Sequence, residues 1–75
     1  MENSTSAIAS LTLVVNGEAV TTAARTLAEL VQEAGHATSK VATAVNGQFV
    51  AERRRTDTVL RDRDRIEIVS PRQGG

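Results

Sequence analysis

The sequence predicts an α+β roll in which one main helix packs on a mixed sheet of four to five strands. Three observations predict this fold class. Two Asn-Gly pairs each lie between β-prone runs, one strongly helical segment lies between the pairs, and a last β-rich run follows them. The 75 residues are enough for one small domain, because a chain of this size buries about 60% of its unfolded surface.

The first hairpin is predicted from the Asn16-Gly17 pair. A type I′ turn needs positive φ at both central residues, and Asn-Gly tolerates this requirement well. The β-rich run 11–15 precedes the pair and residues 18–22 follow it, so both segments are expected to be strands. Alternation along the first strand places Leu13 on one face of the sheet and Val14 on the other.

The main helix is predicted over residues 27–34. Thr26 and Glu29 form a capping-box pattern, in which the Thr26 hydroxyl accepts from the Glu29 N–H and the Glu29 carboxylate accepts from the Thr26 N–H. Apolar residues then recur at helical spacing and form one stripe: Leu27, Leu30, Val31 and Ala34. Gly35 is expected just past the end of the helix, in the left-handed conformation.

A second hairpin and a last strand complete the predicted sheet. The run 41–45, the Asn46-Gly47 pair and a short return strand over 48–50 repeat the pattern of the first hairpin. Val59-Leu60 is expected to be an apolar anchor, and residues 65–69 are expected to be the last strand. One helix on one face of such a sheet is the plan of a ubiquitin-like, or β-grasp, domain.

The chain divides into three predicted segments. Residues 1–10 are expected to be a flexible leader, residues 11–69 the β-grasp domain and residues 70–75 a flexible C-terminal diglycine tail. The helix covers one face of the sheet and leaves the other at least partly open. The residues expected to dock a partner on that open face are Val14, Ala44 and Val69.

Composition excludes several classes of function. Formal net charge is zero and Phe49 is the only aromatic residue, so neither nucleic-acid binding nor an anionic membrane surface is expected. No apolar run is long enough to span a membrane, and no signal peptide is recognisable, which makes the cytoplasm the expected location. Cysteine is absent, so zinc-thiolate sites and thiol nucleophiles are excluded.

Three further groups of polar side chains could in principle form sites, but each is expected to be structural. His36 has no second ligand and is expected to be exposed in a loop. The arginines 53–55 lack aromatic partners and are expected to form a solvated loop, with partner docking as the alternative. Asp62 and Asp64 alternate with arginines that would neutralise them, which favours a tight turn. No catalytic residue, metal site or bound cofactor is therefore predicted.

The Gly74-Gly75 end is the feature that could carry chemistry. A carboxylate on two residues without side chains can enter a narrow active site in whatever backbone conformation the site requires. It is ionised at neutral pH and can attack the α-phosphate of ATP to form an acyl-adenylate. The catalytic groups would have to come from a partner, which would use the ATP.

The order and spacing of these segments resemble the bacterial thiamine-biosynthesis sulfur carrier proteins, the ThiS family. The residues that carry the resemblance extend over about 11–75 and include Val45-Asn46-Gly47, Val50, Val59-Leu60, the run 65–69 and Gly74-Gly75. The family's usual Asp-Gly-Asp turn is here Asp62-Arg63-Asp64. If that position is left-handed, arginine would cost about 1 kcal/mol there.

The resemblance implies a specific role for the tail. An E1-like adenylyltransferase would activate the Gly75 carboxylate, and a sulfur donor such as a cysteine desulfurase would convert it to a thiocarboxylate that passes sulfur to thiazole synthase. Arg72, Gln73 and Gly74 would enter the partners' active sites. Three alternatives remain open: a carrier for molybdopterin or another sulfurated metabolite, a ubiquitin-like protein modifier, and a binding domain whose terminal glycines are inert.

Overall fold

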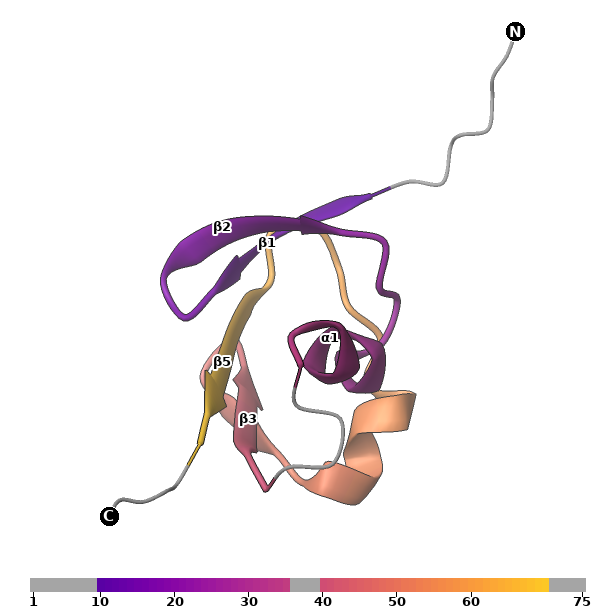
Figure 1. The fold of residues 1–75 in the computed structure, drawn as a ribbon, viewed down its shortest axis with the longest axis vertical. Helices are drawn as coiled ribbons and strands as arrows, with labels where there is room; N and C mark the ends of the chain where they lie inside the picture. The colour runs from indigo at the N-terminus through magenta and orange to yellow at the C-terminus, as the bar shows by residue number, and fades with distance from the viewer. Residues whose placement is uncertain (1–9, 36–39, 71–75) are drawn as a thin grey trace, which may run out of the picture.

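Five strands form one mixed sheet in the order β2-β1-β5-β3-β4, with a helix packed on one face (Figure 1). The computed structural model describes residues 10–35 and 40–70. The elements are β1 (Leu11–Val15), β2 (Glu18–Thr22), α1 (Leu27–Glu33), β3 (Ala42–Val45), β4 (Gln48–Val50), the 3₁₀ helix η2 (Glu52–Asp57) and β5 (Arg65–Val69). The predicted fold class is confirmed. Residues 1–9 of the predicted leader, His36 and residues 71–75 of the predicted tail lie outside the described residues.

Both hairpins have the predicted turn geometry. Asn16 and Asn46 each have φ of 51°, and the glycines that follow them, Gly17 and Gly47, each have φ of 86°. Positive φ at both central positions is the requirement of a type I′ turn, whose twist matches that of the paired strands. These turns determine which residues face each other across β1–β2 and across β3–β4.

The side chains of the two turn asparagines attach both hairpins to β5. Asn16 Nδ2 donates to the Ile68 carbonyl over 3.1 Å, and Asn16 Oδ1 accepts from the Ile68 N–H over 2.9 Å. Asn46 Oδ1 accepts from the Arg65 N–H over 2.9 Å. The last strand therefore lies parallel to β1 and antiparallel to β3 in the centre of the sheet, held at its flanks by the two turns.

The helix start differs in one bond from the predicted capping box. Glu29 N–H donates to Thr26 Oγ1 over 3.2 Å, as predicted. The Glu29 carboxylate, however, accepts from the Arg25 N–H over 2.7 Å and not from the Thr26 N–H. Thr26 also lies in an extended bridge with Val59, in which the Leu27 N–H donates to the Thr58 carbonyl and the Leu60 N–H donates to the Arg25 carbonyl. Gly35 follows the helix with φ of 90°, as predicted.

The core lies between α1 and one face of the sheet. Its buried apolar residues are Leu13, Ala24, Leu27, Leu30, Val31, Leu60, Ile66 and Ile68. Ile66 and Ile68 face this core while their neighbours in β5 are exposed, which confirms the predicted alternation. The predicted Val59-Leu60 anchor is only half right: Leu60 is buried, whereas Val59 is 67% exposed. The bridge to Thr26 explains the difference, because an extended segment turns successive side chains to opposite sides.

The prediction of a solvated arginine loop is wrong for Arg55. Residues 52–57 form η2, and Arg55 on this helix is only 7% exposed. Its Nε donates to Thr43 Oγ1 over 3.1 Å and its second terminal nitrogen donates to the Val41 carbonyl over 2.6 Å. Arg53 and Arg54 are exposed, as predicted. The 3₁₀ helix directs Arg55 inward, where the Thr43 hydroxyl and the Val41 carbonyl accept its hydrogen bonds.

The Asp62-Arg63-Asp64 segment is a tight turn, but its aspartates are not chiefly neutralised by arginines. Asp62 Oδ1 accepts from the Thr12 N–H over 2.8 Å, and Asp64 Oδ2 accepts from the Arg61 N–H over 2.9 Å. The one ion pair of the described residues joins Arg63 to Asp62 at 4.0 Å and is exposed. Arg63 has φ of 73°, so an arginine occupies the left-handed position.

Candidate functional site

The predicted reactive segment begins where β5 ends. Val69 is the last residue of β5, and Ser70 is the last described residue after it. Arg72, Gln73, Gly74 and Gly75 lie outside the described residues, so the positions of these four predicted site residues are not described. Because β5 is the central strand, the chain leaves the domain beside the middle of the sheet.

The face of the sheet opposite α1 carries the predicted docking residues. We call this surface the open sheet face, since no described element lies over it (Figure 1). Register places Val14 beside Arg65, Ala44 beside Glu67, and Ala42 beside Val69. Val69 is 56% exposed, and Val14 and Ala44 are half-buried. The structure therefore places Val14, Ala44 and Val69 on one face, and their docking role stays a prediction.

Phe49 is a further residue of the open sheet face that the sequence reasoning missed. It pairs with Ala44 across the second hairpin, so its ring lies on the same face as Ala44. At 72% exposure it is the most exposed large apolar side chain of the described residues. A signal was present in the sequence, because a two-residue Asn46-Gly47 turn pairs Val45 with Gln48 and hence Ala44 with Phe49.

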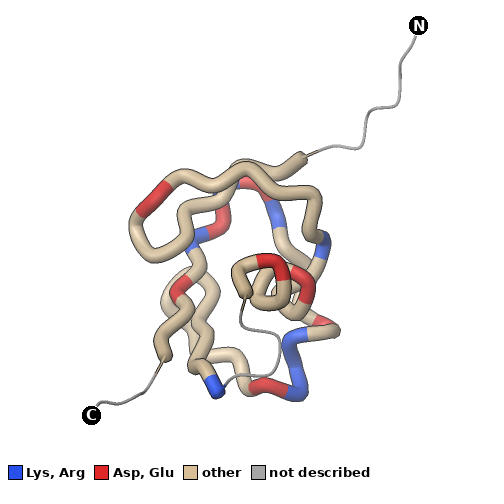
Figure 2. The backbone as a smooth tube through the Cα atoms, in the orientation of Figure 1, with Lys and Arg blue, Asp and Glu red and all other residues tan. Residues whose placement is uncertain are grey.

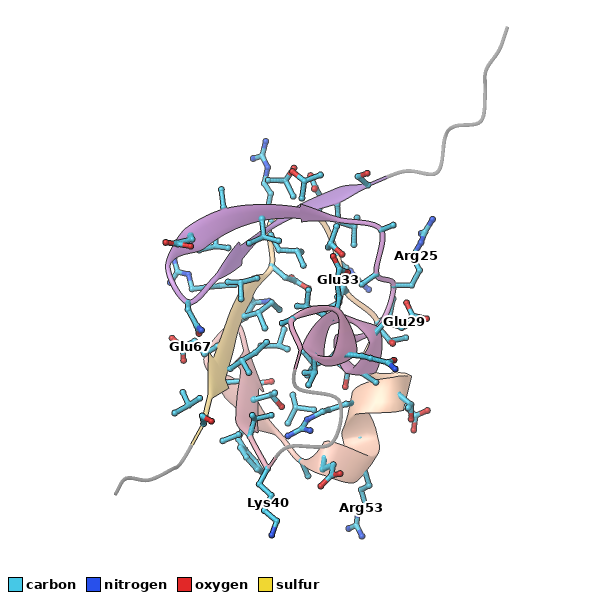
Figure 3. The ribbon with its side chains drawn as sticks, viewed as in Figure 1. Arg25, Glu29, Glu33, Lys40, Arg53 and Glu67 are labelled. Carbon is cyan, nitrogen blue, oxygen red and sulfur yellow. The ribbon has the colours of Figure 1, made fainter. Side chains whose placement is uncertain are left out.

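Two charged residues of β5 lie within the open sheet face. Arg65 and Glu67 are both exposed and alternate with the buried Ile66 and Ile68. Figure 3 shows the Glu67 side chain on the side of β5 away from α1. Figure 2 shows acidic and basic positions spread along the described chain, with uncharged stretches between them. The face thus combines apolar side chains with one acidic and one basic side chain on its central strand.

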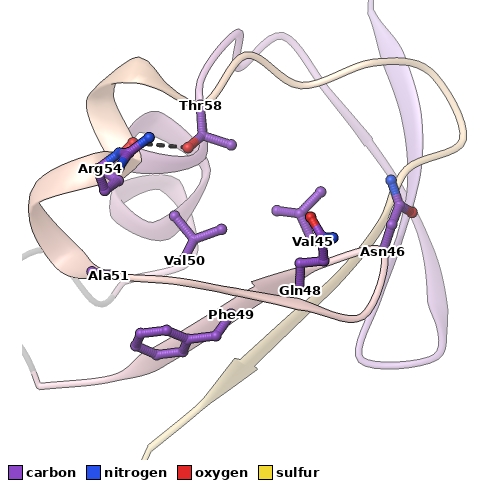
Figure 4. A pocket seen from close by; sticks show the side chains of 8 residues that line it. All are labelled: Val45, Asn46, Gln48, Phe49, Val50, Ala51, Arg54 and Thr58. Carbon is purple, nitrogen blue, oxygen red and sulfur yellow. Dashed lines mark hydrogen bonds between the residues drawn. The ribbon is translucent and has the colours of Figure 1, made fainter.

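A groove of about 510 Å³ lies between β4 and the segment that carries Arg54 and Thr58 (Figure 4). Its lining residues are Val45, Asn46, Gln48, Phe49, Val50, Ala51, Arg54 and Thr58. Thr58 Oγ1 donates to the Arg54 carbonyl over 2.8 Å, so a hydrogen bond joins these two lining residues. Arg54 is the one charged side chain among the described residues that line the groove.

The described residues hold no cluster of three His, Cys, Asp or Glu side chains that could bind a metal ion. In the same ranges, 10–35 and 40–70, no helix is long and apolar enough to cross a membrane. The surface features that remain as candidates for function are the open sheet face and the chain that leaves β5 beside it.

Comparison with protein families identifies the family to which this chain belongs. The model of the ThiS family matches residues 9–75. The chain belongs to the ThiS family. The match covers the whole β-grasp domain and extends over the Gly74-Gly75 pair, and it confirms the resemblance seen in the sequence to the thiamine-biosynthesis sulfur carriers.

A solved structure of the family has the same fold. The crystal structure of the thiamine biosynthesis protein (ThiS) from Geobacter metallireducens superposes with a TM-score of 0.71 and is 26% identical in sequence. The alignment covers 87% of this chain and 100% of that one. No curated protein sequence matches the chain. The ThiS fold is therefore shared over nearly the full chain at low sequence identity.

Proposed function

We propose that this ThiS-family chain carries sulfur as a thiocarboxylate on Gly75 for assembly of the thiamine thiazole ring. An E1-like adenylyltransferase joins the Gly75 carboxylate to the α-phosphate of ATP and releases pyrophosphate. A sulfur donor such as a cysteine desulfurase then supplies the sulfur: its persulfide attacks the acyl-adenylate and displaces AMP, and a thiol reductant cleaves the resulting acyl disulfide to leave the thiocarboxylate. Thiazole synthase receives this sulfur from the resulting thiocarboxylate. The chain acts as a co-substrate, and ATP is used by the activating partner.

The observation that carries this proposal is the extent of the family match. It extends to residue 75, so the Gly74-Gly75 pair lies within the family pattern together with the folded domain. A match limited to the β-grasp domain would favour a binding domain with inert glycines equally well. Glycine at both positions suits a narrow active site, because a side chain there would collide with its walls.

The folded domain supplies recognition in this proposal. The tail that starts after Val69 must reach an active site while the partner holds the domain, and the open sheet face lies directly beside that starting point. Val14, Ala44, Val69 and Phe49 give this face exposed apolar area, and such area on a small protein is typical of a contact surface. We therefore place the activating enzyme on the open sheet face, with Arg72, Gln73 and Gly74 leading Gly75 into its active site.

The proposal is tested by the intact mass of the protein after reaction. The chain is incubated with ATP, the E1-like enzyme and a sulfur donor, and a mass increase equal to one oxygen replaced by sulfur is expected. A chain without Gly75 should remain unchanged and serves as the control. Absence of the mass change with active partner enzymes would contradict the proposal, and adducts on lysine side chains would instead indicate a protein modifier.

The acceptor of the sulfur is identified in a second step. Addition of thiazole synthase to the thiocarboxylate form should return the chain to its original mass and yield thiazole product. The large subunit of molybdopterin synthase should leave the thiocarboxylate intact. The reverse pattern would assign the chain to molybdopterin and would refute the thiamine assignment while leaving the carrier chemistry standing.

A further inference from the structure

We propose that the Glu67 carboxylate is the charged contact that selects the activating enzyme, by pairing with an arginine or lysine of that enzyme. The inference rests on the proposed function and specifies the chemistry of the partner surface. It concerns a single side chain at the centre of the open sheet face, two residues before the strand ends at Val69.

Three apolar residues lie near Glu67 on the open sheet face, and Arg65 precedes it on the same face of β5. Ala44 lies opposite it on β3, Phe49 lies beyond Ala44 on β4, and Val69 follows it on the same face of β5. Phe49 and Val69 are 72% and 56% exposed, so a partner that covers these side chains also covers the carboxylate between them. Figure 3 shows that Glu67 extends outward from β5, in the direction from which such a partner would approach.

Glu67 has no cation of its own within the described residues. Residues 10–35 and 40–70 contain one ion pair, and it joins Arg63 to Asp62 in the turn before β5. Arg65 lies on the same face as Glu67 but makes no ion pair with it, and its strand neighbour is Val14. A carboxylate covered without a compensating charge is strongly unfavourable. An activating enzyme that binds this face must therefore bring a cation to Glu67.

This charge gives the surface a selectivity that apolar contacts alone would not supply. Ala42, Ala44, Val69 and Phe49 would accept many apolar partner surfaces, because hydrophobic contact is not directional. A carboxylate among them rejects every partner that leaves it unpaired, and it favours a partner whose cation meets it. Glu67 thus distinguishes the correct enzyme from other proteins with apolar binding surfaces.

The position of Glu67 in the chain also limits where the partner cation lies. Eight residues separate Glu67 from Gly75, and an extended chain of that length spans roughly 28 Å at most. With roughly 10 Å added for the Glu67 side chain, its ion pair and the contact of the Gly75 carboxylate with phosphorus, the arginine or lysine that meets Glu67 must lie within roughly 40 Å of the ATP α-phosphate in the enzyme.

The experiment measures binding of the chain to its E1-like enzyme at low and at high salt. Glu67→Lys is expected to weaken binding roughly 30-fold or more at low salt, and Glu67→Gln is expected to weaken it less, because it removes attraction without adding repulsion. The salt dependence of binding should be shallower for Glu67→Gln than for the unsubstituted chain. The matched control is Glu18→Lys, since Glu18 is exposed and pairs with Val15 on the other face of the sheet.

Each outcome separates the inference from the proposed function. If the unsubstituted chain is adenylated and Glu67→Lys binds equally well, the inference is wrong and the carrier function stands. If the unsubstituted chain is neither bound nor adenylated by the enzyme, both are wrong. Equal losses in Glu67→Lys and Glu18→Lys would also overturn the inference, because they would indicate a general charge effect. Restored binding of Glu67→Lys to an enzyme with a reversed charge at one basic residue would confirm the pair.

Discussion

Arg55 Nε donates to the hydroxyl of Thr43 over 3.1 Å, and both side chains are buried. The Thr43 hydroxyl in turn donates to the Val50 carbonyl over 2.8 Å. A second nitrogen of Arg55 donates to the Val41 carbonyl. One guanidinium on η2 thereby joins this helix to the start of β3, to β3 itself and, through Thr43, to β4.

We predict that Arg55→Ala destabilises the domain by about 2–4 kcal/mol. The substitution removes a buried side chain and leaves the Val41 carbonyl without its donor. The free energy of unfolding is measured by urea denaturation followed by far-UV circular dichroism, because the chain has no Trp or Tyr to report by fluorescence.

Arg54→Ala is the matched control for this prediction. Arg54 is the preceding residue of the same 3₁₀ helix and has the same side chain, but it is exposed. Its substitution should change the free energy of unfolding by about 0.5 kcal/mol or less. Equal losses for Arg54→Ala and Arg55→Ala would show that helix propensity, and not the buried hydrogen bonds, sets the cost.

Local chemistry explains why most of the fold could be predicted and Arg55 could not. Asn-Gly turns, a threonine helix cap and alternating strands depend on neighbours in sequence, so the pattern around Asn16 or Thr26 was sufficient. Arg55 is buried because Thr43 and Val41, more than ten residues away, supply acceptors at the right place. Three consecutive arginines contain nothing that distinguishes the buried one.

The turn asparagines provide a second prediction, in which the same substitution has different costs at two equivalent positions. Asn16→Gly should destabilise the domain by about 1–2 kcal/mol, because two part-buried hydrogen bonds to Ile68 are lost. Asn46→Gly should cost less, because its side-chain bonds to Asp64 and Arg65 are exposed and water can replace them. Glycine keeps the positive φ that both turns require.

Urea unfolding of the two glycine variants checks this order. Asn16→Ala is the additional control, since alanine loses the same bonds and also resists positive φ, which should add about 1 kcal/mol to the cost of Asn16→Gly. An Asn46→Gly variant that is less stable than Asn16→Gly would contradict the assignment of Asn16 as the stronger attachment of β5.

The arginine at the left-handed position of the turn before β5 gives a stabilising prediction. Arg63 has φ of 73° and is 87% exposed at its side chain. Arg63→Gly should raise the free energy of unfolding by about 0.5–1 kcal/mol, because glycine adopts this conformation without strain and the lost exposed ion pair contributes little. Its melting temperature and urea midpoint should both rise.

Arg61→Gly is the control for that effect. Arg61 is exposed in the same turn but does not have positive φ, so glycine there should leave stability unchanged or lower it. If both glycine variants are equally stable, left-handed strain at Arg63 is not a cost to this domain. The sequence comparison with the family's Asp-Gly-Asp turn indicated this position, and the structure gives it the φ that glycine favours.

Only part of the candidate site could be predicted from the sequence. The role of Gly75 stays a prediction, because this residue lies outside the described ranges; it rests on the diglycine pair together with the resemblance to the family. Val14, Ala44 and Val69 followed from strand alternation. Phe49 was missed because its place on the face follows from the register that the Asn46-Gly47 turn sets between β4 and β3, and not from the pattern within its own short strand.

Two exposed valines test which surface the activating enzyme uses. Val69→Arg should slow adenylation of Gly75 roughly tenfold or more, because it places a long charged side chain within the contact proposed for the open sheet face, at the end of β5 where the tail begins. Val59→Arg should change the rate by less than roughly twofold. Val59 is as exposed as Val69, at 67% against 56%, but it lies in the bridge to Thr26 at the start of α1 and not in the sheet.

The rate is followed as pyrophosphate release with the E1-like enzyme, at enzyme concentrations below saturation so that weaker binding is detected. Far-UV circular dichroism and urea unfolding of both variants confirm that the fold is retained, which is expected because neither valine belongs to the buried core. A slower reaction for Val59→Arg, with Val69→Arg unaffected, would move the enzyme contact from the open sheet face to the helix side of the domain.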